Sequence, residues 1–114
     1  MIEPRLTSGF RISALKQLVE ACGGFATLLR KGDPTSGAIL IIAQIRGRNP
    51  VLYERYPALD GTMTWHAVTP QIEGNDVEVT IYWEKRVSRD PDLWVIELDV
   101  ASPERLAGLL AFEA

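Results

Sequence analysis

The residues best suited to chemistry are charged side chains in two short segments, one in each half of the chain. They are Arg30, Lys31, Asp33, Arg89, Asp90 and Asp92. Loops at strand ends can meet at one edge of a sheet, so these residues predict a mixed-charge rim suited to a phosphate or a divalent cation. The alternative is that Asp33 and Asp90 have only a structural role, in which each accepts hydrogen bonds from the backbone of its own turn beside a proline. We favour this alternative.

His66 and Cys22 belong to the residue types that most often bind metals or act as nucleophiles. Each is the single residue of its type, so a zinc site or a Ser-His-Asp triad would depend on His66 alone. Cys22 falls at the C-terminal end of a predicted helix, where the helix dipole disfavours the thiolate. We therefore expect His66 to be a surface or hydrogen-bonded structural residue and Cys22 to be a small core residue. Without a glycine-rich phosphate loop, a nucleophile elbow or paired cysteines, no metal, cofactor or catalytic residue is predicted.

Charge is divided unevenly along the chain, although the net charge is only −3. Residues 5–55 contain eight basic and three acidic side chains, whereas residues 56–114 contain four basic and eleven acidic ones. A basic face suited to the phosphates of a nucleic acid would consist of Arg30, Lys31, Arg46 and Arg48. The alternative, which we favour, is that the two halves interleave in one fold and their charges mix on its surface.

A metal-dependent nuclease is the enzyme class that suits the basic first half best. The predicted element order loosely follows a nuclease core that uses Pro-Asp and Asp/Glu-x-Lys, with Glu20 and Asp33 as the metal-binding acids. Residues 44–46 and 54–56, on the strands that follow, lack the lysine that this chemistry uses to activate water. A nucleic-acid-binding or nuclease-like protein is therefore the alternative and not the preferred interpretation.

Length and composition indicate one globular domain over residues 1–114. The chain is 46% hydrophobic and 24% charged, which excludes wholesale disorder and fibrous repeats. One cysteine excludes an intrachain disulfide, and the longest apolar run, residues 38–43, is too short to cross a bilayer. The N-terminus carries Glu3 and Pro4 and lacks the apolar segment of a signal peptide, so we expect a cytoplasmic protein with no membrane partner.

The spacing of apolar residues predicts the elements that must position these side chains. Ser8 is expected to cap a helix that runs to about Ala21 and ends at Gly23 and Gly24. Four strands should follow, separated by turns rich in glycine, proline and asparagine: residues 25–31, 38–46, 51–56 and 63–68. The second is apolar on both faces, which is typical of a central strand covered on two sides. The successive short turns favour an antiparallel meander.

Residues 75–89 are ambiguous between helix and strand. The alternation of apolar residues from Val77 to Trp83 favours a strand. A helix is favoured by three- and four-residue spacings, by Asn75 with Glu78 as a capping box, and by the basic last turn. We predict a helix, followed by a strand at 93–100 and a last helix that begins at Ser102-Pro103-Glu104.

Together these elements predict an α+β fold in the order α-β-β-β-β-α-β-α. We expect a mostly antiparallel sheet of about five strands, with two or three helices covering one face. The three tryptophans and the C-terminal Leu109, Leu110 and Phe112 favour self-association, such as a homodimer. The alternative is that these side chains complete a small core.

Three segments of the chain resemble a known family. They are residues 22–26, 30–40 and 90–97, which include a Gly-Asp-Pro turn at 32–34 and an Asp-Pro-Asp-Leu-Trp motif at 90–94. On these motifs the chain resembles, up to about Asp99, a family of small alphaproteobacterial proteins called domain of unknown function 1491. The resemblance implies a small cytoplasmic α+β protein with a helix before Asp90, and it implies no activity. Residues 70–76 and the helix from Ser102 are less typical of that family.

The sequence therefore predicts a small non-catalytic binding or interaction module. Its partner would be another protein, a second copy of the chain or a small anionic ligand. The alternative is a protein that binds or hydrolyses nucleic acid through the basic N-terminal half.

Overall fold

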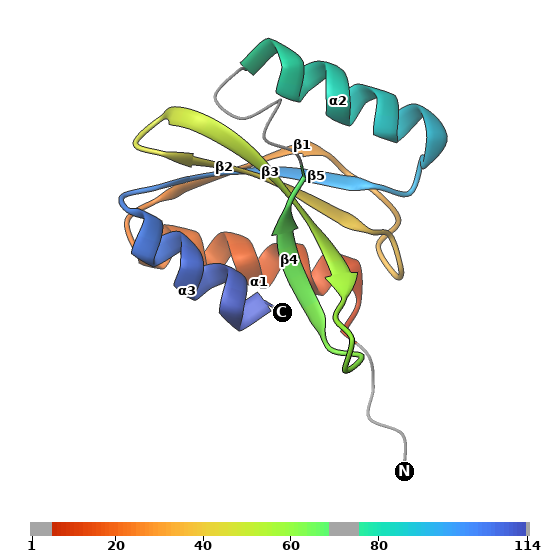
Figure 1. Ribbon diagram of the computed structural model, residues 1–114, viewed down its shortest axis with the longest axis horizontal. Helices are drawn as coiled ribbons and strands as arrows, with labels where there is room; N and C mark the ends of the chain where they lie inside the picture. The colour runs from red at the N-terminus through yellow and green to blue at the C-terminus, as the bar shows by residue number, and fades with distance from the viewer. Residues whose placement is uncertain (1–5, 69–75, 114) are drawn as a thin grey trace.

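The computed structural model describes residues 6–68 and 76–113 and contains the predicted succession of helices and strands (Figure 1). The elements are α1 (Ser8–Ala21), β1 (Phe25–Arg30), β2 (Ile39–Ile45), β3 (Arg48–Pro57), β4 (Met63–Ala67), α2 (Asp76–Arg89), β5 (Trp94–Val100) and α3 (Pro103–Glu113). The α+β class and the element order are thus confirmed, and the ambiguous segment is a helix. Among the described helices, none is long and apolar enough to span a membrane. The Asn75 cap lies outside the described residues, as do residues 70–75 of the atypical segment.

The sheet has the strand order β1-β5-β2-β3-β4. Strand β5 pairs antiparallel with β1 and parallel with β2, so the sheet is mixed. The expected four-stranded meander is wrong at its first connection, because only β2, β3 and β4 follow one another through hairpins. The segment from Lys31 to Ala38 is long enough to pass over an inserted strand, a step of about 10 Å. β1 and β2 therefore lie one strand apart, and β5 occupies the position between them.

Helices cover both faces of the sheet (Figure 1). On one face α1 and α3 pack against side chains of β2 and β5, and on the other α2 packs against a second apolar cluster. The prediction that helices cover one face is therefore wrong, whereas the prediction of a central strand covered on two sides is confirmed for β2. Its residues Leu40 and Ile42 face α2, while Ile39, Ile41 and Ala43 face α1 and α3.

The tryptophans and the C-terminal leucines contribute to these two cores. Trp94 is buried, and Trp65 and Trp83 are half-buried against the α1 and the α2 clusters respectively. Leu109 is buried and Leu110 packs beside it. These five side chains thus contribute to the core of a single chain, whereas the side chain of Phe112 lies outside those that the structure describes, and self-association stays a prediction.

The start of α1 is held by the turn between β1 and β2. Thr7, and not Ser8, is the N-cap, with its Oγ1 accepting from the Phe10 N–H at 3.2 Å. Ser8 lies one residue inside the helix and is buried, and its hydroxyl donates to the Gly37 carbonyl at 2.5 Å. The Gly9 N–H donates to the Pro34 carbonyl at 2.8 Å. The prediction of Ser8 as the cap is wrong because its hydroxyl is used by this tertiary contact.

Two other boundaries have clear local causes. The hairpin between β2 and β3 has a two-residue turn, Arg46 and Gly47, both with positive φ (52° and 73°), so β3 begins at Arg48 and not at Val51. The final helix begins as predicted, because the Ser102 hydroxyl oxygen accepts from the Arg105 N–H at 3.2 Å.

Candidate functional site

The two charged loops singled out from the sequence do meet. The Asp33 N–H donates to the Asp92 carbonyl at 3.0 Å, and the Arg30 guanidinium donates to the Pro91 carbonyl at 2.8 Å. The indole of Trp94 donates to the Asp33 carbonyl at 2.7 Å. The turn after β1 and the loop before β5 therefore form one structural unit at this end of the sheet, joined through backbone carbonyls.

The carboxylates of this unit are used within their own loops. Asp33 accepts from the N–H groups of Thr35 and Ser36, at 3.2 and 2.9 Å, and from the Ser36 hydroxyl. The Ser36 N–H is the main cause that holds the pKa of Asp33 below its usual range. Asp90 accepts from the Asp92 N–H at 3.2 Å. Lys31, Arg89 and Asp92 are exposed. Over residues 6–68 and 76–113, no three His, Cys, Asp or Glu side chains gather as metal ligands would.

The four residues of the candidate basic face lie at two opposite ends of the sheet. Arg30 is level with Val95 at the start of β5, and Lys31 follows it. Arg46 lies in the turn after Ile45 and Arg48 follows that turn, and Ile45 is level with Val100 at the other end of β5. Five residues of strand correspond to about 17 Å, so the four side chains form no single surface. The Arg46 guanidinium also donates to the Ala101 carbonyl at 3.3 Å.

The residues of the nuclease interpretation are likewise separated. Asp33 adjoins the first turn of α1, whereas Glu20 is exposed at the other end of that helix. Twelve residues of α-helix separate Ser8 from Glu20, which corresponds to about 18 Å. Glu20 and Asp33 are therefore not placed to share one metal ion.

His66 and Cys22 are both surface residues. The His66 ring shares a hydrogen bond with the Thr64 hydroxyl at 2.7 Å and lies 5.9 Å from the Tyr56 ring, on exposed strand β4. Cys22 is exposed, so its prediction as a core residue is wrong. Cys22 is the C-cap of α1, and the buried residue of the last turn of that helix is Val19.

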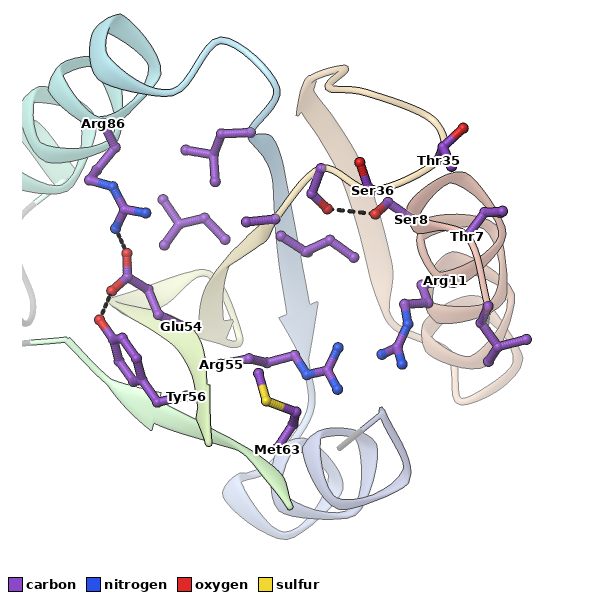
Figure 2. A pocket seen from close by; sticks show the side chains of 16 residues that line it. Thr7, Ser8, Arg11, Thr35, Ser36, Glu54, Arg55, Tyr56, Met63 and Arg86 are labelled. Carbon is purple, nitrogen blue, oxygen red and sulfur yellow. Dashed lines mark hydrogen bonds and ion pairs between the residues drawn. The ribbon is translucent and has the colours of Figure 1, made fainter. Parts of the chain in front are cut away.

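A cavity that the sequence did not reveal lies between α1, the turn after β1, and β3 (Figure 2). Its volume is about 570 Å³. Polar lining residues come from α1 and the turn (Thr7, Ser8, Arg11, Thr35, Ser36) and from β3 and α2 (Glu54, Arg55, Tyr56, Arg86). The apolar part of the lining includes Leu6, Ile39, Leu40, Met63 and Leu93.

The cavity exists because two neighbouring strands separate. The ladder between β2 and β3 begins at the pair Ile41–Tyr53. Before this point β2 continues to Ile39 paired with β5, and after it β3 continues to Pro57 paired with β4. The sheet therefore forks, and we call the opening between the two branches the fork. Leu40 and Glu54 line it from opposite branches.

Glu54 is a buried carboxylate at one side of the fork. Its side chain is 8% exposed, and it forms an ion pair with Arg86 of α2. The Tyr56 hydroxyl donates to the other carboxylate oxygen of Glu54 (Figure 2). This arrangement joins β3 to α2 and leaves this side of the cavity without net charge among its described residues.

Arg11 and Arg55 lie on the other side of the fork. In Figure 2 their guanidinium groups point toward each other, from α1 and from β3. Arg55 is half-buried, and its guanidinium lies 5.8 Å from the centre of the Trp65 ring. Two guanidinium groups from different elements thus face one space.

The sequence carried only a faint signal of this site. Glu54 follows Leu52 on the buried side of its strand, and an acid at a position of that periodicity predicts a buried polar contact. Its partner Arg86 is thirty-two residues away, and nothing in the pattern links the two.

Comparisons with known proteins agree on the fold. The family described as "Protein of unknown function (DUF1491)" matches residues 6–108. A crystal structure of a DUF1491 family protein from Caulobacter crescentus CB15 is 30% identical, covers 83% of this chain and 88% of its own, and has a TM-score of 0.77. A solution structure of a protein from A. tumefaciens is 27% identical, covers 90% and 92%, and has a TM-score of 0.74. No curated protein matches the chain.

Proposed function

The chain belongs to the DUF1491 family of proteins of unknown function, and we propose that it is a non-catalytic module that binds a small anionic ligand in the cavity between α1 and β3. The observation that carries this proposal is the convergence of Arg11 and Arg55 on one cavity. Guanidinium groups suit carboxylate and phosphate, because their planar N–H donors match the spacing of the anion's oxygens.

The local electrostatics support an anion over a cation. Three of the described lining residues are arginines, each with five N–H donors that suit an anion's oxygens, and one is a glutamate, which is paired with Arg86. The N-terminus of α1 faces the same cavity, and its dipole favours negative charge. The backbone donors there are already used, since Ser8 and Gly9 donate to Thr35 and Pro34. An anion would therefore be held by side chains and not by backbone N–H groups.

The size and lining of the cavity support a small molecule. A volume of about 570 Å³ lies in the range typical of small-molecule sites. Ile39, Leu40, Met63 and Leu93 supply apolar walls, which suit an organic body next to the charged group. Among the described lining residues none is histidine, cysteine or aspartate, and Glu54 is held by two partners. This composition favours binding over catalysis.

Thermal unfolding with added anions tests the proposal. Inorganic phosphate and hexanoate, each compared with sodium chloride at equal ionic strength, should raise the melting temperature of the full chain. A ligand at a hundred times its Kd adds about 2.7 kcal/mol, which corresponds to several degrees for a domain of this size. Arg55→Gln and Arg11→Gln should each remove most of this shift.

Arg48→Gln is the matched control, because Arg48 lies on the same strand as Arg55 but is exposed outside the cavity. It should keep the full shift. A shift of equal size in Arg55→Gln and in Arg48→Gln, or none beyond that of chloride in the unmodified chain, would overturn the proposal.

A further inference from the structure

The cavity reaches both faces of the sheet, because it passes through the fork. Glu54 and Arg55 are consecutive on β3, so their side chains lie on opposite faces. Glu54 is on the α2 face, where Arg86 meets it, and Arg55 is on the α1 face with Arg11. All four side chains nevertheless line the same cavity.

The lining changes character along this passage. On the α1 face its described residues present the guanidinium groups of Arg11 and Arg55. In the fork it is apolar, through Ile39 and Leu40 at the start of β2 and Leu93 just before β5. On the α2 face it is polar without net charge among the described residues, because Glu54, Arg86 and Tyr56 satisfy one another.

We infer, on the basis of the proposed anion site, that the ligand is an elongated aliphatic acid or phosphate monoester whose far end carries an uncharged hydrogen-bonding group. The anionic group lies at Arg11 and Arg55, the aliphatic chain occupies the fork, and a hydroxyl or amide reaches Glu54 and Tyr56. A second anionic group would be desolvated here without gaining a cation of its own, because Arg86 is already paired with Glu54. An aliphatic end would strip water from these polar groups without replacing their hydrogen bonds.

The lining argues against a nucleotide. Tyr56 is the one aromatic side chain among the described lining residues, and its hydroxyl is held by Glu54. A nucleobase is commonly held by stacking on an aromatic ring or by paired polar contacts on its edge. The passage between the two strands offers aliphatic contacts instead, from Ile39, Leu40 and Leu93, and these suit a flexible chain.

Calorimetric titration of the full-length protein with matched ligands tests the inference. In the series acetate, butyrate, hexanoate and octanoate, affinity should rise about fourfold for each methylene buried, until the fork is filled. At the best chain length, adding an ω-hydroxyl should improve affinity by about fivefold to tenfold. An ω-carboxylate should weaken binding. Comparing the affinity for hexanoate with that for hexyl phosphate shows whether the site prefers a carboxylate or a phosphate.

Variants test separately the residues that hold the anionic end and the far end of the ligand. Arg55→Gln should weaken every ligand of the series, whereas Glu54→Gln should remove only the gain from the ω-hydroxyl and leave hexanoate unchanged. Because Glu54→Gln disturbs a buried ion pair, Tyr56→Phe serves as a second variant that keeps Glu54 and Arg86, and it should reduce the same gain. Thr64→Ser, on the neighbouring strand and outside the lining, is the control.

The outcomes separate the two proposals. If anions bind and depend on Arg55, but neither chain length nor the ω-hydroxyl matters, the inference is overturned and the anion site stands. A dicarboxylate that binds more tightly than the hydroxy acid overturns it too. If no member of the series binds and phosphate gives no protection, the anion site fails as well.

Discussion

The indole Nε1 of Trp94 donates a hydrogen bond to the backbone carbonyl of Asp33 at 2.7 Å. Trp94 is the first residue of β5, and Asp33 lies in the turn between β1 and β2, which also receives the first turn of α1. This one bond therefore joins β5 to the turn that forms a wall of the cavity.

Replacing Trp94 with phenylalanine should lower the free energy of unfolding by about 2 kcal/mol, because the Asp33 carbonyl loses its donor and the core loses volume. Urea unfolding measures the change. Trp83→Phe is the matched control, since Trp83 is half-buried against the α2 core, and its loss should be smaller. Equal losses in the two variants would show that the hydrogen bond contributes nothing measurable.

Two glycine-to-alanine substitutions should act in opposite directions. A Cβ on Gly37 would clash with the Asp92 carbonyl oxygen, so Gly37→Ala forces the two loops apart and should cost about 3 kcal/mol or more. Gly108 lies within α3, and a Cβ there meets no atom within 4 Å. Gly108→Ala should therefore stabilise the fold by up to about 1 kcal/mol through helix propensity. Thermal and urea unfolding measure the loss of stability in Gly37→Ala and the gain in Gly108→Ala. An unchanged stability of Gly37→Ala would refute the close packing of these loops.

Glu54→Ala should destabilise the protein by about 3 kcal/mol, because Arg86 is left with its charge partly buried and without its carboxylate. Glu84→Ala provides the comparison, since Glu84 is exposed on α2, the helix that carries Arg86. Its effect on the free energy of unfolding should be within about 0.5 kcal/mol. Hydrogen exchange of α2 amides should increase in Glu54→Ala and not in Glu84→Ala. Unchanged exchange in Glu54→Ala would mean that the ion pair does not hold α2 on the sheet.

Glu97→Gln should change the pH dependence of stability. Partial burial, and then the negative charges of Asp76 and Asp99, raise the pKa of Glu97 above its usual value. The folded state therefore binds a proton more readily than the unfolded chain, so this carboxyl lowers stability as the pH rises through its folded pKa. At neutral pH, Glu97→Gln should melt at a higher temperature than the unmodified chain. The difference should vanish below the usual carboxyl pKa of 4.5, and a difference independent of pH would rule out this origin.

Glu104→Gln controls for the loss of one negative charge, because Glu104 is exposed in the first turn of α3. It should not reproduce the gain at neutral pH. A negative charge at a helix N-terminus is favourable, so its removal should slightly lower the melting temperature.

Local patterns predicted the elements well, and the reasons lie in particular residues. Side chains from Ile39 to Ala43 are apolar on both faces, so β2 had to be covered on two sides. The Ser102 cap fixed the start of α3. The insertion of β5 between β1 and β2 could not be predicted in this way, because strand neighbours depend on which edges remain free after the hairpins form.

The cavity could not be predicted from the sequence, for a similar reason. Its side chains come from α1, β3 and α2, and the space between them results from the separation of β2 and β3 beyond Ile41 and Tyr53. No local pattern encodes that separation. Conversely, the aspartates that stood out in the sequence proved to be turn residues, as their position beside proline had suggested.

The placement of β5 also sets an order for folding. During synthesis β1 and β2 leave the ribosome long before β5, and they do not pair with each other in the folded sheet, because β5 lies between them. Their edges stay open until Trp94–Val100 arrives and inserts between them, making ladders on both sides at once. Contacts so distant in sequence slow folding. The nascent chain is thus most exposed to misassociation just before its last strand is made.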